Sequence, residues 1–375
     1  MRGEAACGRR PRTAPRFWSA VRVAARPLAP LPGVVVTTAH AQAGLVAAWQ
    51  LAAGGVAKAR VHRLVDAGVL VRVARGVYDL TTVPVPTERT ARLDRQRERT
   101  ARLGVLLHGP AAVATGLSAL VLYGVRGVPP SFTPEVALRA GGAVARTDGA
   151  RVRREPVPRL VHRGGVPCVP PEVALAQAVG EVDRWTAVAL MDSARQRRVL
   201  TERTFAAARQ LARGRRGAAR SRRWWDASDA RAESPAETWA RLRLADDGLP
   251  PDVLQLPVRG GDGRPLARVD LAWFLGGGRW LLGEVDGIDV HGTREAVVAD
   301  LHRQNAIVTG ATILRRWTGA QARTRAFVDD VRQVLDAAGW RPGRACPGEL
   351  ALPARVPARE ASGSVPEPRG FRNRP

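Results

Sequence analysis

Two carboxylates stand one residue apart at the end of an apolar run in the segment RWLLGEVDGIDVHG, residues 279–292. Side chains alternate along a strand, so Glu284 and Asp286 share one face of the strand that we predict here. Charges of one sign repel each other at the end of a buried strand unless a positive group lies between them. A divalent cation is such a group, and it would give these carboxylates a chemical role.

Asp270 supplies a third carboxylate. We predict that VLQLPV and LARVDLAW form a hairpin around the turn RGGDGRP, and that the segment above is the next strand. Asp270 lies between Val269 and Leu271, so alternation places it on the face opposite to both, where it can lie beside Glu284. Oxygen ligands in this number suit Mg²⁺ or Mn²⁺ rather than zinc. We therefore predict a metal site at Asp270 and Glu284, where Mg²⁺ orients water and polarises a phosphate, as phosphodiester hydrolysis requires.

The same region resembles the very-short-patch-repair-like branch of the PD-(D/E)XK nucleases. That branch shows a helical Glu, a strand Asp, the motif Glu-x-Asp-Gly, a nearby His or Tyr, and a helix with Asp-x-x-Arg. The resemblance covers about a quarter of the chain and implies a mixed sheet flanked by helices over residues 233–340. The catalytic positions that it implies are Glu237, Asp270, Glu284, Asp286, His291 and Arg303, the last paired with Asp300 in the helical motif.

The pattern departs from the nuclease family at one position. The usual lysine two residues after the motif Glu is replaced by Asp286, and Lys58, the only lysine of the chain, lies far away in the sequence. Arginine cannot act as a general base, so Arg303 offers only a fixed charge. Either His291 or His302 could handle protons near neutral pH. Two interpretations therefore stay open: another catalytic arrangement, or a binding site without catalysis.

Structural explanations also stay open for these carboxylates. Asp270 and Glu284 could form ion pairs with Arg268 or Arg303. Glu237 follows Ser234 and Pro235 in the pattern S-P-x-E, which is a capping box with proline at the first helical position. That explanation accounts for Glu237 without any chemistry.

A different pattern, over residues 37–82, predicts a winged helix-turn-helix. The stretch 44–80 indicates a short helix to about Ala53, a Gly-Gly turn, a second helix over about 57–67 ended by Gly68, and the strands VLVRV and GVYDL. The basic residues that we expect to meet a major groove and its phosphates are Lys58, Arg60, His62, Arg63, Arg72 and Arg75. The alternatives are a solvated face on a small helical core, or a module that binds protein.

This stretch and the block after it resemble the AbiEi-type antitoxin regulators of type IV toxin–antitoxin systems, which actinobacteria commonly join to the nuclease-like domain. The resemblance implies DNA binding and autoregulation. It also implies that a cognate toxin protein is a partner, so that an antitoxin or adaptor acting through protein contact is a further hypothesis.

Composition agrees with a nucleic-acid partner. The 375-residue chain has a formal net charge of +25, which points first to nucleic acid and second to an anionic membrane surface. Nearly every cation is arginine, and such a bias is also typical of a GC-rich genome. No run approaches the ~18–20 apolar residues of a membrane span. Three isolated cysteines exclude a disulfide framework and argue against a structural zinc site, and we expect a cytoplasmic protein.

These patterns predict an α+β multidomain chain in six segments. We expect a disordered Arg/Pro-rich leader at 1–36 or a start codon assigned too early, the winged helix at 37–82, a middle α/β domain at 83–200, an Arg-rich helical connector at 201–232, the nuclease-like domain at 233–340, and a disordered tail at 341–375. In the middle domain we predict one long helix over 172–196, with Asp183 and Asp192 in solvent. The connector could lie along a phosphate backbone or simply face solvent. The sequence does not indicate the oligomeric state.

Overall fold

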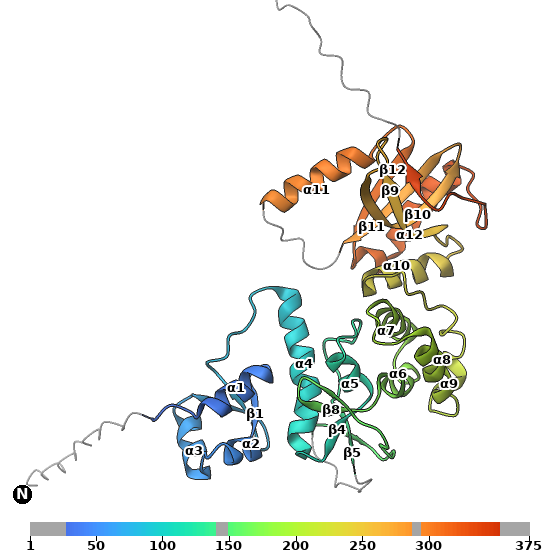
Figure 1. Cartoon of the computed structure of the whole chain (residues 1–375). Coiled ribbons are helices and arrows are strands. Elements are labelled where there is room, and N and C mark those ends of the chain that lie inside the picture. Colours follow the sequence, from blue (N-terminus) through green and yellow to red (C-terminus); the bar gives the residue numbers. More distant parts are fainter. Residues whose placement is uncertain (1–27, 140–148, 287–293, 353–375) are drawn as a thin grey trace, which may run out of the picture.

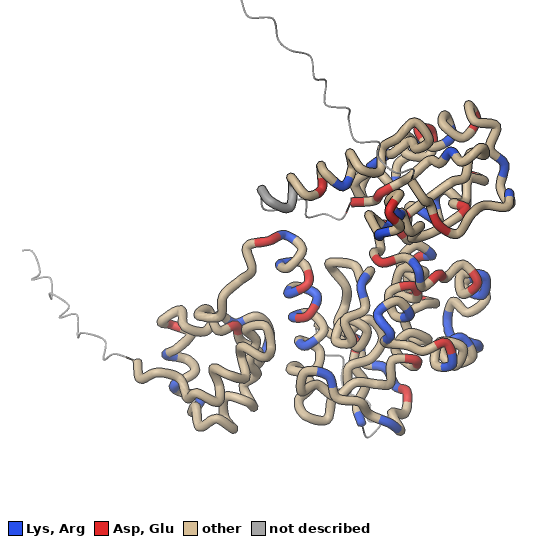
Figure 2. The backbone as a smooth tube through the Cα atoms, turned by 45° about the horizontal axis from the view of Figure 1, so that its top comes forward, with Lys and Arg blue, Asp and Glu red and all other residues tan. Residues whose placement is uncertain are grey.

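The computed structural model describes residues 28–139, 149–286 and 294–352. Within these ranges the chain has α+β architecture, and its strands form three separate sheets (Figure 1). Lys and Arg residues are spread over all three sheet-containing parts of the tube (Figure 2). The predicted α+β class and multidomain organisation agree with this arrangement.

The first part has the element order of a winged helix. Its elements are α1 (Gly33–Ala41), β1 (Leu45–Ala47), α2 (Ala48–Ala53), α3 (Lys58–Asp66), β2 (Leu70–Ala74) and β3 (Val77–Leu80). The strands pair antiparallel in the order β1-β3-β2, and we call the hairpin β2–β3 the wing. Gly68, just after α3, has a φ of 70°, a left-handed conformation that favours glycine and ends the helix as predicted.

Two features of this part differ from the prediction. Leu28 and Leu31 pack on the core formed by α1, α3 and the wing, so the predicted leader extends too far toward the C-terminus. Residues 45–47, predicted within a helix, form strand β1, whose three side chains are all buried. A fully buried run of three residues has no periodicity that separates strand from helix.

The middle part contains a mixed five-stranded sheet, of order β6-β5-β4-β8-β7. Its elements are α4 (Arg89–His108), β4 (Ala112–Ala114), α5 (Gly116–Leu122), β5 (Glu135–Leu138), β6 (Arg151–Arg153), β7 (Val161–Arg163), β8 (Val166–Cys168), α6 (Pro171–Val179) and α7 (Arg184–Gln196). The single helix predicted over 172–196 is wrong, because Gly180 ends α6 and Asp183 begins α7 by accepting a hydrogen bond from the Thr186 amide at 3.0 Å.

The predicted connector packs as part of this middle domain. Its helices are α8 (Glu202–Leu211) and α9 (Ala218–Ser221). Ala208, Ala212 and Trp225 are buried in the same core as α6 and α7. The segment is therefore amphipathic rather than simply solvated, and its arginines lie on the outer side of a packed unit.

The last part is built on a mixed five-stranded sheet, of order β12-β11-β10-β9-β13. Its elements are α10 (Pro235–Asp246), β9 (Val253–Arg259), β10 (Pro265–Gly276), β11 (Arg279–Asp286), α11 (Arg294–Ile307), β12 (Thr312–Thr318), the 3-10 turn η1 (Gln321–Arg323), α12 (Arg325–Ala337) and β13 (Leu350–Ala351). Strands β9, β10 and β11 pair antiparallel, whereas β11 pairs parallel with β12.

Helices α10 and α12 cover one face of this sheet, whereas, among the described residues of α11, only its C-terminal end reaches the other face. Residues of α10 and α12 share one apolar cluster with Trp273 and Leu281, and Ile307 of α11 shares the other with Trp280 and Leu282 (Figure 1). The mixed sheet agrees with the prediction for residues 233–340, whereas the predicted nuclease-like fold stays a prediction. The predicted tail begins too early, because Leu350 and Leu352 pack against β9.

Candidate functional site

Helix α3 exposes a basic side. Its apolar residues Val61 and Leu64 are buried, whereas Lys58, His62 and Arg63 lie on the exposed side. The helix is therefore amphipathic, with its cations directed away from the core.

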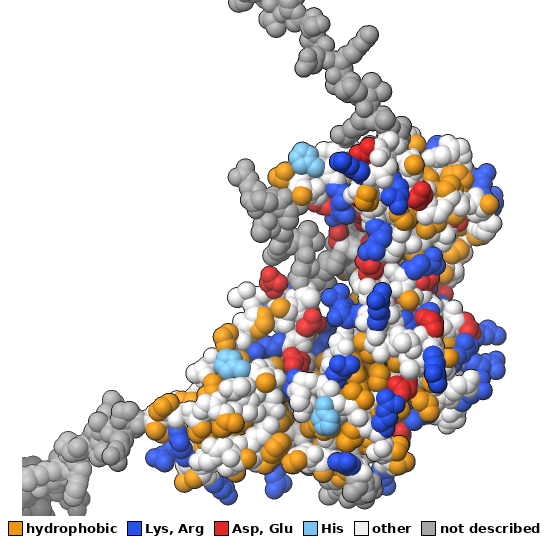
Figure 3. Space-filling view, viewed as in Figure 1, with side chains coloured by type: hydrophobic (Ala, Val, Ile, Leu, Met, Phe, Trp, Pro, Cys, Tyr) orange, Lys and Arg blue, Asp and Glu red, His pale blue; other side chains and the backbone are white. Residues whose placement is uncertain are grey.

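The wing adds two more exposed cations. Arg72 lies on β2 and Arg75 in the turn that follows it, and basic side chains gather over this end of the molecule in Figure 3. None of Lys58, Arg63, Arg72 and Arg75 has an acidic partner in the part of the chain that the structure describes. We call Lys58, His62, Arg63, Arg72 and Arg75 the basic face.

Arg60, predicted with these residues, is engaged elsewhere. Its Nη2 donates to the carbonyl oxygens of Ala29 and Pro30, each at 2.8 Å. The guanidinium therefore holds the segment before α1 against α3, and we leave Arg60 out of the basic face.

At the predicted acidic site, Glu237 and Asp270 lie on either side of a shared amide. Gln255 Nε2 donates to Glu237 Oε2 at 2.8 Å and to Asp270 Oδ1 at 3.1 Å. The other Asp270 oxygen accepts from the Val285 amide at 2.9 Å, which brings Asp270 next to Glu284 on β11 as predicted. Asp270 has no ion pair among the described residues, and Arg268 instead pairs with Glu233 at 2.6 Å.

The side of the sheet that Asp270 occupies does not follow from simple alternation. Val269 packs in the cluster that holds Ile307, whereas Leu271 packs in the cluster of α10 and α12, so its two neighbours lie on opposite faces. The prediction that Asp270 opposes both is therefore wrong. The reason is local: Gln255, across from Asp270 on β9, has a φ of 56°, a left-handed conformation that interrupts the regular pleat.

Glu237 only partly follows the predicted capping box. Ser234 Oγ accepts from the Glu237 amide at 3.2 Å, as expected of an N-cap. The Glu237 carboxylate, however, accepts from the Glu233 amide at 2.8 Å in addition to its bond from Gln255. Glu237 is thus drawn toward Asp270 and is only 7% exposed.

The positive group between Glu284 and Asp286 is Arg316. On β12 it lies opposite Glu284 in the parallel ladder. Its Nη2 lies 2.8 Å from Asp286 Oδ1, and its Nε lies 3.3 Å from Glu284 Oε2. Arg316 Nη1 also reaches Asp300 on α11 at 2.5 Å. The sequence patterns above did not single out Arg316, although the arginine pair in the strand ATILRRW is the signal for it.

Arg303 contacts two acidic residues of this group. Its Nη2 lies 3.7 Å from Glu284 and 2.5 Å from Asp300, so its shorter contact is with its own helix neighbour. His291 lies outside the described residues, and His302 is exposed on α11.

Burial raises the proton affinity of three carboxyls at the acidic site. Burial, and then the neighbouring Asp270 charge, raises the pKa of Glu237 to about 7. Burial also raises the pKa of Asp270, against the hydrogen bonds from Val285 and Gln255. The pKa of Glu284 is raised by burial too, although Arg303 and Arg316 oppose the shift. We call Glu237, Asp270 and Glu284 the carboxylate site.

The donor set of the carboxylate site suits a hard divalent cation. Asp270 is free of any cationic partner in the described ranges, whereas Arg316 already neutralises part of the Glu284 charge. Among the described residues, no three His, Cys, Asp or Glu side chains are grouped in a ready metal-binding arrangement. The metal site at Asp270 and Glu284 therefore stays a prediction.

Comparison with known proteins gives a family for the N-terminal part. Residues 35–81 match the family described as transcriptional regulator, AbiEi antitoxin. Two proteins of Mycobacterium tuberculosis, each named as uncharacterized (MT2308 and Rv2248), are 33% identical to this chain over 209 residues. The aligned part covers 55% of this chain and 70% of each relative. No helix in the described ranges combines the length and apolar character needed to span a membrane.

Proposed function

This chain belongs to the family of the mycobacterial proteins MT2308 and Rv2248, and we propose that it is a DNA-binding transcriptional regulator of the antitoxin type. The observation that supports this proposal is the basic face on α3 and the wing, whose lysine and arginines have no acidic partner in the described chain.

The basic face suits the two kinds of contact that a winged helix makes. A recognition helix places its N-terminal residues against base edges in the major groove, and Lys58 and His62 lie on the first half of α3. Arg72 and Arg75 on the wing are placed to contact phosphates beside that groove. Arginine suits both roles, because its planar fork binds guanine edges and phosphates through two hydrogen bonds.

The proposal is tested with the Arg63→Gln/Arg72→Gln double variant and duplex DNA from the chain's own promoter. We expect at least about tenfold weaker binding by fluorescence anisotropy, since a charged hydrogen bond contributes about 1.5–3 kcal/mol. In a plot of log affinity against log salt concentration, the slope should also become shallower by about two, roughly one for each phosphate contact removed.

The matched control removes the same charge from another part of the chain. Arg264, in the turn before β10, and Arg279, at the start of β11, are exposed, and the Arg264→Gln/Arg279→Gln variant should bind almost as the unaltered protein does. Equal losses in the two double variants would mean that binding follows total charge and would overturn the proposed role of the basic face.

The antitoxin family also suggests a cognate toxin as a protein partner. Under this proposal the chain binds DNA through the basic face and binds the toxin through other surfaces. A toxin-like nucleotidyltransferase encoded beside this chain and co-purifying with it would support that partner.

A second function is favoured by the carboxylate site: metal-dependent hydrolysis of DNA. Three carboxyls with raised pKa, two of them buried, lie on α10, β10 and β11, which is costly for a purely structural group. Asp270 and Glu284 would hold Mg²⁺ or Mn²⁺, and that ion would supply Lewis acidity at a phosphate oxygen. Glu237 would orient the Asp270 carboxylate through Gln255. Arg316 would remain as a fixed positive charge near Glu284.

Plasmid cleavage in Mg²⁺ or Mn²⁺ tests this second function. We expect the unaltered protein to nick or linearise the plasmid and the Asp270→Ala/Glu284→Ala variant to be at least about a hundredfold slower, as for the loss of groups that stabilise transition-state charge. Thermal unfolding would establish that the variant is folded. Identical behaviour of the two folded proteins would remove the endonuclease hypothesis and leave the regulator intact.

A further inference from the structure

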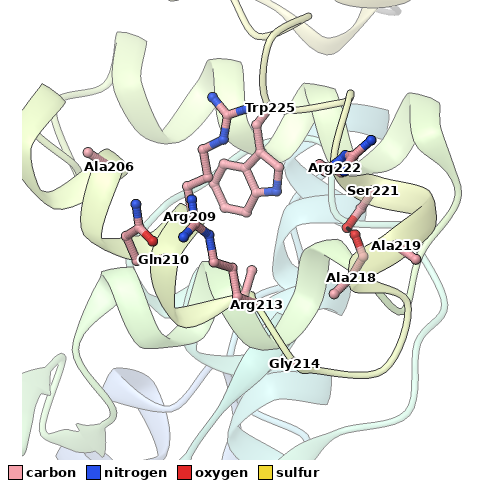
Figure 4. Close-up of a pocket in the computed structure, with 11 residues that line it drawn as sticks. Ala206, Arg209, Gln210, Arg213, Gly214, Ala218, Ala219, Ser221, Arg222 and Trp225 are labelled. Atoms are coloured by element: carbon pink, nitrogen blue, oxygen red, sulfur yellow. Dashed lines mark hydrogen bonds between the residues drawn. The ribbon is translucent and has the colours of Figure 1, made fainter.

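A groove of about 710 Å³ opens between α8 and α9, in the segment predicted as a connector. Figure 4 shows Arg209 and Arg213 on one side of the Trp225 ring, and Arg222 with Ser221 on the other. The volume is within the range of about 300–1,000 Å³ that is typical of small-molecule sites.

The rim of this groove is positively charged. Arg209 is paired with Asp226 at 2.7 Å. Arg213 and Arg222 are exposed, and neither has an acidic partner in the portion of the chain that the structure describes. Two guanidinium groups with unused donors therefore face the opening, and guanidinium binds phosphate through parallel charged hydrogen bonds.

The interior of the groove is apolar. Trp225 packs on Phe205 with ring centroids 5.3 Å apart and is held in the core, so its position is rigid. Ala206 of α8 and Ala218 of α9 leave room beside the indole ring because their side chains are small. A ligand for this groove thus needs an apolar or planar group as well as an anionic one.

The groove is distant from the basic face. In Figure 1, α3 and α9 lie at opposite ends of the molecule, with the middle sheet between them. A DNA duplex bound on α3 and the wing would therefore not also fill this groove. A ligand of the groove would be a different molecule from that duplex.

We propose that the groove between α8 and α9 binds a phosphate ester that carries a planar or apolar group, such as a nucleotide. The phosphate contacts Arg213 and Arg222, and the planar group enters beside Trp225. The same chemistry is present in a free nucleotide and in a nucleotide unit of a single strand, so both are tested.

The test is calorimetric titration of the full chain with adenosine monophosphate, phenyl phosphate, inorganic phosphate and a short thymidine oligonucleotide. Binding of the first two, with inorganic phosphate at least about tenfold weaker, is expected if the apolar interior contributes. The oligonucleotide distinguishes the sources: tighter binding than the monophosphate indicates a strand, and weaker binding indicates a free nucleotide.

Two pairs of variants locate the site. Arg213→Gln/Arg222→Gln should weaken adenosine monophosphate binding at least about tenfold, whereas Arg203→Gln/Arg223→Gln, which removes exposed arginines outside the lining, should not. Ala206→Leu should block the interior, and Ala207→Leu, its exposed neighbour on α8 outside the lining, is the control. No binding of either ester, or equal effects within either pair, would overturn the proposal.

Discussion

At the scale of single residues, two pairs of neighbouring acidic side chains have different partners: Glu284 with Asp286, and Glu237 with Asp270. Glu284 and Asp286 share the Arg316 guanidinium, which lies 3.3 Å and 2.8 Å from them. Glu237 and Asp270 have no such cation among the described residues and share the amide of Gln255 instead. An amide donates to a carboxylate but cannot cancel its charge. Burial, and then the neighbouring Asp270 charge, therefore raises the pKa of Glu237.

This difference predicts a pH-dependent contribution of Glu237 to stability. The unfolded chain ionises Glu237 near its usual pKa of 4.5, whereas the folded chain does so at about 7. Stability from this residue is therefore full below pH 4.5 and is lost as the pH rises to 7, by at most about 3 kcal/mol. Urea unfolding should show a smaller fall in stability from pH 5 to pH 8 for Glu237→Gln than for the unaltered protein. The same fall in both proteins would show that Glu237 is ionised at neutral pH in the folded state.

At the scale of elements, the sequence predicts helices and strands best where the spacing of the apolar residues is regular. Helix α3 and the wing follow from the spacing of Val61 and Leu64 and from Gly68. Short buried elements such as β1 and β4 were missed, because a fully buried run of three residues carries no alternation. The single helix predicted over 172–196 is wrong because Gly180 ends one helix and Asp183, three residues later, is the N-cap of the next.

The hairpin of β9 and β10 shows a different limit of pattern analysis. Its strands and their pairing follow from the sequence, but the side of the sheet that Asp270 occupies depends on the left-handed backbone of Gln255. A non-glycine residue in that conformation is uncommon and cannot be recognised from residue type. The pairing of Asp270 with Glu284 was therefore predictable, whereas its contact with Glu237 was not.

At the scale of the whole molecule, the middle and C-terminal parts are joined through a buried charge. Asp192 on α7 is 1% exposed, accepts from Thr238 Oγ1 at 2.8 Å, and pairs with Arg241 of α10 at 2.8 Å. The Asp229 amide donates to its other oxygen at 2.7 Å. The prediction that Asp192 is solvated is wrong, because α10 packs over it. The carboxylate site on α10 is thereby attached to the middle domain.

Removing Asp192 should loosen this junction. Asp192→Ala leaves Arg241, Thr238 and the Asp229 amide without their acceptor, and we expect a loss of about 3 kcal/mol or more in the free energy of unfolding. Asp246→Ala is the matched control: Asp246 also joins α10 to α7, by a pair with Arg184 at 2.6 Å, but that pair is solvent-exposed and should contribute under about 1 kcal/mol. Equal losses measured by urea unfolding would show that burial of Asp192 adds nothing to the junction.

The sequence by itself determined the winged helix and the order of strands and helices in the C-terminal sheet. These depend on local periodicity and turn residues, which neighbouring residues encode, and the pairing of adjacent strands also brought Asp270 near Glu284, although its face of the sheet did not follow from alternation. The tertiary structure decided that Arg316 is the cation between Glu284 and Asp286, that Arg60 holds the segment before α1, and that the arginine-rich segment folds into a groove. Each of these depends on which distant segments pack together, and strand register and helix packing are set by the whole core rather than by any one stretch of residues.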